Sequence, residues 1–74
     1  MGKNLVGNHI RKLRFDHDEM TQQQLADKVG VTRQTIVALE KGSYSPSLEL
    51  AFRISRFFGL SLEEVFFYKD DSEQ

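Results

Sequence analysis

Residues 33–41 carry side chains that can form hydrogen bonds with planar polar groups. If Ile36 faces the core of a helix, a step of about 100° per residue decides which side chains point outward. They are Arg33 (at the border), Gln34, Val37, Ala38 and Lys41. This face has no acidic residue, unlike an ordinary solvated face. Arginine pairs with guanine, glutamine pairs with adenine, and small methyl groups contact the thymine methyl. The pattern favours a base-reading face, with a plain solvent-exposed surface as the alternative.

Groups able to hold a phosphate backbone lie on both sides of this segment. Gln22 begins a predicted helix over 22–29, where free N–H groups and the positive end of the dipole favour an anion. The loop after residue 41 is polar, and its hydroxyl and ammonium donors are Lys41, Ser43, Tyr44, Ser45 and Ser47. For each of these residues, ordinary turn and capping chemistry is the alternative.

The sequence holds no set of residues arranged for catalysis or metal binding. There is no cysteine, and His9 and His17 lack the partners of a nucleophilic or zinc site. The acidic residues Asp16, Asp18 and Glu19 are expected to form a solvated loop. No apolar run approaches the ~20 residues of a membrane span. We therefore expect a cytoplasmic protein that is no enzyme and uses no cofactor, metal, membrane or small-molecule ligand.

The charges are distributed unevenly. The chain has a net charge of −1, but residues 63–74 hold five acidic residues and one basic residue. Residues 1–62 therefore hold nine basic residues against six acidic ones, a net charge of +3. We interpret residues 69–74 as an acidic tail directed away from DNA, or as a merely solvated end of the chain.

Explicit start and stop signals divide the chain into short helices. Thr21 with Gln24, and Ser61 with Glu64, are spaced as capping boxes. Further caps are expected at Thr32 and Ser47, and helix-ending glycines at Gly30, Gly42 and Gly59. The predicted helices cover 5–16, 22–29, 33–41, 48–58 and 62–67. Phe66-Phe67-Tyr68 is strand-prone, and Lys3-Asn4-Leu5 is the expected partner in a short terminal ribbon.

Two of these helices, 22–29 and 33–41, are separated by a tight turn containing Gly30. Two short helices with such a turn are typical of a helix-turn-helix, and the small Ala26 permits their close crossing. A generic helical hairpin explains the caps but not the acid-free outer face.

Large apolar side chains exceed what five short helices can bury. Phe52 and Phe57 fall on the flanks of helix 48–58, and Phe66 and Phe67 lie near the end of the next helix. This surplus predicts a homodimer contact.

Three stretches together resemble the Cro/repressor-type helix-turn-helix family, often called XRE. They are MTQQQLADKVGVTRQTI (20–36), LEKG with YSPSL (39–48), and FGLSLEEVF (58–66). The resemblance spans about residues 5–68 and implies an all-α, five-helix, lambda-repressor-like DNA-binding domain. The loop from Arg14 to Gln22 is one residue longer than is usual in the family.

The resemblance also implies roles for individual residues. The implied base readers are Arg33, Gln34 and Ala38, and the implied backbone contacts are Gln22, Thr32, Lys41, Ser43 and Ser45. Arg14 and Glu40 match a structural salt bridge of the family. Short members dimerise through the last helix and terminal ribbon, which correspond to Val65, Phe66, Phe67 and Tyr68 here.

The function expected from these observations is binding of a homodimer to a near-palindromic double-stranded DNA operator, with repression as the expected mode. The first alternative is an antitoxin that carries the same domain and also binds a partner protein. The second is an interaction module that has lost DNA binding. That second alternative predicts acidic or bulky residues at 33, 34 and 38, which this sequence lacks.

Overall fold

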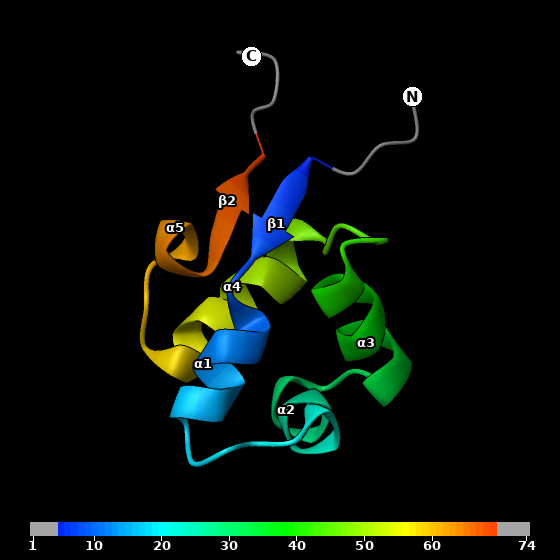
Figure 1. Ribbon diagram of the computed structural model, residues 1–74, viewed down its shortest axis with the longest axis vertical. Helices are drawn as coiled ribbons and strands as arrows, with labels where there is room; N and C mark the ends of the chain where they lie inside the picture. Colours follow the sequence, from blue (N-terminus) through cyan, green and yellow to red (C-terminus); the bar gives the residue numbers. More distant parts are fainter. Residues whose placement is uncertain (1–4, 70–74) are drawn as a thin grey trace.

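A computed structural model describes residues 5–69. Five helices and a two-stranded antiparallel sheet form the domain (Figure 1). In chain order they are β1 (Val6–Asn8), α1 (Ile10–Asp16), α2 (Gln22–Val29), α3 (Arg33–Lys41), α4 (Leu48–Phe58), α5 (Leu62–Val65) and β2 (Phe66–Tyr68). The predicted all-α class with a terminal ribbon is confirmed.

Local capping chemistry sets the start of four helices. The side chains of Thr21, Thr32, Ser47 and Ser61 each accept a hydrogen bond from the backbone amide three residues later. Thr21 and Ser61 form complete capping boxes, as their spacing predicted. These bonds satisfy amides that have no partner within the helix. The predicted bounds of α2, α3 and α4 are therefore confirmed.

The predicted start of the first helix and the predicted end of the last helix were wrong, because the chain forms the ribbon there. The helix expected over 5–16 begins at Ile10, because residues 6–8 are extended and pair with β2. The helix expected over 62–67 ends at Val65, where the chain enters β2. The ribbon partner is Val6–Asn8 rather than the expected Lys3-Asn4-Leu5, of which Lys3 and Asn4 lie outside the described residues.

The ribbon projects from one end of the helical body (Figure 1). Hydrogen bonds of Asn8 and His9 attach it there. The side-chain amide nitrogen of Asn8 donates to the backbone carbonyl of Leu39 in α3 at 2.9 Å. The side-chain oxygen of Asn8 accepts from the backbone amide of Ile10 at 3.1 Å. The His9 amide donates to the Val65 carbonyl at 2.8 Å. Within the ribbon, Gly7 lies so close to the Phe67 ring that a Cβ at this position would overlap it. Asn8 thus links the ribbon to both α1 and α3.

A small apolar core joins all the helices. Its members are Ile10, Leu25, Ala26, Val29, Ile36, Leu39, Leu50, Ala51, Ile54, Val65 and Phe66. α2 and α3 pack directly on one another, and α4 packs against α2 and α5. The core therefore holds α2 and α3 against one another.

Candidate functional site

The turn between α2 and α3 is closed by backbone hydrogen bonds. The amides of Gly30 and Val31 both donate to the carbonyl of Ala26, at 2.8 and 3.0 Å. Gly30 has a φ of 80°, a left-handed conformation that glycine adopts without steric cost. Because Ala26 is also completely buried, the two helices cross closely at this point. Gly30 and Ala26 thus account for the tight turn between the two helices.

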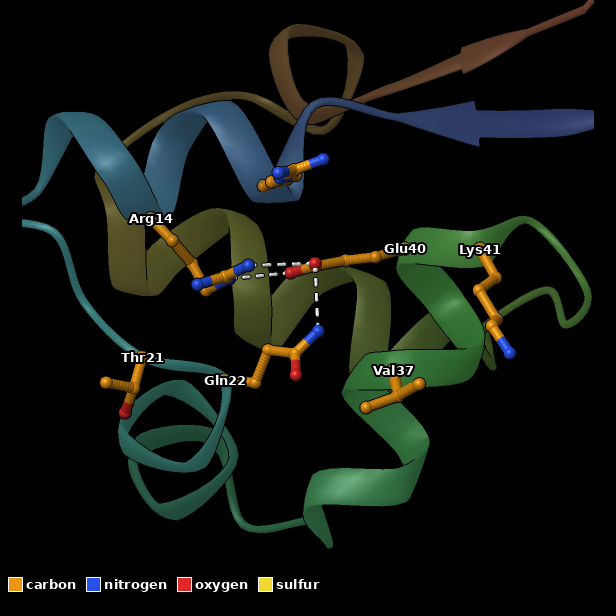
Figure 2. A pocket seen from close by; sticks show the side chains of 7 residues that line it. Arg14, Thr21, Gln22, Val37, Glu40 and Lys41 are labelled. Atoms are coloured by element: carbon orange, nitrogen blue, oxygen red, sulfur yellow. Dashed lines mark hydrogen bonds and ion pairs between the residues drawn. The ribbon is translucent and has the colours of Figure 1, made fainter.

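A largely buried ion pair holds the far end of α3. Arg14 of α1 donates from Nε and Nη2 to the two carboxylate oxygens of Glu40, at 2.6 and 2.9 Å (Figure 2). Their side chains are only 14% and 9% exposed. Nη1 of Arg14 donates to the Met20 carbonyl at 2.7 Å, which ties the long loop after α1 into the same contact. The structure thus brings together the two residues that the family resemblance paired.

Gln22 joins this pair from the start of α2. Its Nε2 donates to Oε1 of Glu40 at 3.2 Å, so Glu40 receives hydrogen bonds from two helices (Figure 2). The Gln22 side chain is half-buried and engaged within the protein. Nε2 of Gln22 carries two hydrogens, so the side chain can donate its second N–H to a phosphate while it remains bonded to Glu40, and the backbone amides of the first helical turn offer further donors.

The outer face of α3 presents the predicted base-reading residues together. Arg33 and Gln34 are exposed in the first turn, and Val37 and Ala38 are half-buried one turn later. The first turn of α3 holds no acidic residue, and Glu40 points inward toward Arg14. The result is an accessible helix face with donors at its N-terminal end and no negative charge.

The residues expected to contact the DNA backbone lie at the two ends of α3. The Thr32 hydroxyl caps α3 by accepting from the Thr35 amide at 3.4 Å. Lys41 is exposed at the end of α3, and the exposed Ser43, Tyr44 and Ser45 follow it in the loop. Oγ of Ser43 lies 3.4 Å from the Ala38 carbonyl, to which it donates. Donors thus lie at both ends of the helix.

The aromatic residues predicted for a dimer contact divide into two groups. Phe52, Phe67 and Tyr68 are exposed by 48%, 40% and 65%. Val65 and Phe66 are buried in the core of the single chain, where their residues are 0% and 7% exposed. Their assignment to a dimer contact stays a prediction.

Phe57 and the two histidines make aromatic contacts within the chain. The Phe57 ring is half-buried and lies 5.4 Å from the His17 ring, measured between centroids. The His9 ring lies 4.8 Å from that of Phe67.

Among residues 5–69, no cluster of three potential metal ligands occurs, and no helix is long and apolar enough to cross a membrane.

Comparison with known proteins identifies the family. A family model described as Helix-turn-helix matches residues 10–65. An HTH-type transcriptional regulator of Methanocaldococcus jannaschii is 53% identical over 64 residues, covering 86% of this chain and 96% of the relative. The chain belongs to the XRE-type family of helix-turn-helix transcriptional regulators. Family membership places it among DNA-binding regulators rather than enzymes.

More distant matches extend the comparison. The CTXphi repressor RstR of Vibrio cholerae is 34% identical over 61 residues, which cover 82% of this chain and 54% of RstR. The antitoxin PezA of Streptococcus pneumoniae is 34% identical over 61 residues, or 82% of this chain and 38% of PezA. The crystal structure of a Bacteroides fragilis protein with a suggested DNA-binding role has a TM-score of 0.71. It is 17% identical and covers 85% of this chain and all of that chain, and this likeness supports the fold alone.

Proposed function

We propose that this regulator binds a near-palindromic operator as a homodimer and reads it with α3, acting as a repressor. The observation that carries the proposal is the exposed outer face of α3, which has no acidic residue. On the inner side of the helix, the Arg14–Glu40 ion pair attaches α3 to α1. In this arrangement Arg33 and Gln34 contact base edges in the major groove, and Val37 and Ala38 contact thymine methyl groups. The 34% identity with the repressor RstR supports the repressing mode.

A dimer supplies the symmetry that a palindrome requires. Two copies of α3 related by a two-fold axis enter successive major grooves about 34 Å apart. Phe52, Phe67 and Tyr68 are exposed aromatic residues on α4 and β2 that favour such an assembly, and Phe57, also on α4, is half-buried. The dimer surface is therefore proposed to be Phe52, Phe57, Phe67 and Tyr68.

Selection of bound sequences from a random duplex pool tests the function directly. The expected product is one inverted repeat with half-sites about one helical turn apart. Enrichment of a single unrepeated site would contradict dimeric reading. No enrichment at all, with the chain shown to be folded, would contradict sequence-specific binding.

An antitoxin is the second candidate, favoured by the identity with PezA. An antitoxin would bind a partner protein in addition to DNA. Expression of the chain together with its neighbouring gene, followed by purification through a tag on this chain, separates the two functions. A stoichiometric second chain that survives purification supports the antitoxin, and its absence supports the free-standing regulator.

A further inference from the structure

An open hollow lies between α1, α2 and α3, beside the outer face of α3. Its volume is about 570 Å³, and its lining includes Arg11. Gln22, Val37 and Lys41, which also line it, are seen in Figure 2. This open space is large enough to admit a polar group bigger than a water molecule. Val37 and Lys41 belong to the helix proposed to enter the major groove. The hollow therefore borders the path that a DNA strand takes along that groove.

The charges around this hollow do not cancel. Glu40 is its acidic lining residue, and its carboxylate accepts three hydrogen bonds, two from Arg14 and one from Gln22. This negative charge is thus matched by the guanidinium of Arg14. Within residues 5–69, neither Arg11 nor Lys41 takes part in an ion pair. Two positive charges from different helices are left facing one open space.

We propose that this hollow binds one phosphodiester of the DNA backbone and that Arg11 is its principal ligand. This inference rests on the proposed function, because α3 must lie in the groove to bring a strand over the hollow. Phosphate contacts fix the position and orientation of a protein on the duplex without reading its sequence. Arginine matches a phosphate with two parallel N–H donors, whereas lysine presents a point charge. Arg11 thus holds the strand from α1 while Lys41 holds it from α3.

The salt dependence of operator binding tests the role of Arg11. The logarithmic slope of affinity against salt concentration changes by about 0.9 for each phosphate contact. Arg11→Gln should reduce this slope by about two in a dimer and should weaken binding to all single-base operator variants by the same factor. Arg11→Lys should retain the slope. Arg56→Gln is the matched control, since Arg56 is also exposed but lies on α4 outside the hollow.

Other outcomes are equally decisive. A slope for Arg11→Gln equal to that for Arg56→Gln overturns the inference, provided that thermal unfolding shows both variants to be folded. A loss of affinity confined to certain base variants also overturns it, because Arg11 would then be reading sequence. If the parent chain binds all duplexes alike but Arg11→Gln still lowers the slope, the phosphate contact stands and sequence-specific function fails.

A free anion is the other possible source of a phosphate group. Inorganic phosphate added at constant ionic strength should leave operator binding unchanged if the hollow takes only the phosphates of the duplex. Binding of inorganic phosphate to the chain alone that Arg11→Gln abolishes, together with a salt slope for operator binding that Arg11→Gln leaves unchanged, would assign the hollow to a free anion and overturn the DNA contact.

Discussion

Glu40 links three helices through one carboxylate, since Arg14 and Gln22 both donate to it. Glu40→Ala should lower the free energy of unfolding by about 3–5 kcal/mol, because the guanidinium of Arg14 then remains largely buried without its partner. Denaturant unfolding measures this loss. The control is Glu49→Ala, which removes an exposed pair with Arg53 on α4 that is worth about 0.3–0.5 kcal/mol. Similar midpoints for the two variants would contradict a structural role for the buried pair.

Gln34 and Lys41 should fail in different ways when each is replaced by alanine. Gln34→Ala removes a neutral base contact, so it should relax preference at one symmetric pair of operator positions at a cost of about 1–3 kcal/mol per contact. Its salt slope should not change. Lys41→Ala removes a phosphate contact, so it should weaken all operator variants alike and lower the slope.

Titrations against single-base operator variants at several salt concentrations separate these two effects. Arg33→Ala should also relax preference at one symmetric pair of operator positions. If both variants preserve the affinity ratios of the parent chain across all operator variants, α3 does not read the bases.

At the scale of elements, local chemistry decided what the sequence could predict. The bounds of α2, α3 and α4 followed from caps and glycines, which act within a few residues. Val6–Asn8 could not be separated from α1 in this way, because Val6, Ile10 and Leu13 also fit a helical period. Val6–Asn8 forms a strand because it pairs with β2, where Val6 lies opposite Tyr68. A pattern of neighbouring residues does not reveal a contact between segments that are far apart in the sequence.

The candidate site was predicted to a similar extent. The spacing of α3 placed Arg33, Gln34 and Lys41 toward the outer face, and all three are exposed in the structure. The contribution of Arg11 to the hollow was missed, although Arg11 lies three residues before Arg14 and shares its side of α1. The hollow itself depends on how three helices pack, which the sequence pattern does not specify.

The loop after α1 contains two residues in a left-handed conformation, Asp18 (φ 60°) and Glu19 (φ 54°). Such a φ costs an L-residue about 1–2 kcal/mol, and glycine avoids this cost while losing more backbone entropy. Glu19→Gly should therefore raise the free energy of unfolding by about 0.5 kcal/mol. Glu19→Ala is the control, because its Cβ keeps the steric cost. A destabilised Glu19→Gly, or equal gains in both variants, would contradict this explanation.

For the whole molecule, the proposed dimer predicts sedimentation at micromolar concentration with twice the 8.6 kDa mass of the chain. Tyr68→Asp and Phe52→Asp place a charge in the proposed apolar contact, so both should sediment as monomers. Phe15→Asp is the control, since Phe15 is 65% exposed, as Tyr68 is, but lies on α1. A monomeric parent chain, or dissociation by Phe15→Asp alone, would contradict the proposed surface.

The ribbon has a consequence for the order in which the molecule folds. It joins segments about sixty residues apart, so closing it costs more chain entropy than forming any helix or the turn between α2 and α3. We expect the helices to assemble first and the ribbon to close after the transition state. Gly7→Ala, which forces the Phe67 ring to move, should then speed unfolding and leave the refolding rate nearly unchanged, as stopped-flow measurements in the Phe52→Asp background would show. Slower refolding would place the ribbon in the folding nucleus. The ribbon then sets the unfolding rate, and with it the lifetime of the native state, rather than the rate at which the native state forms.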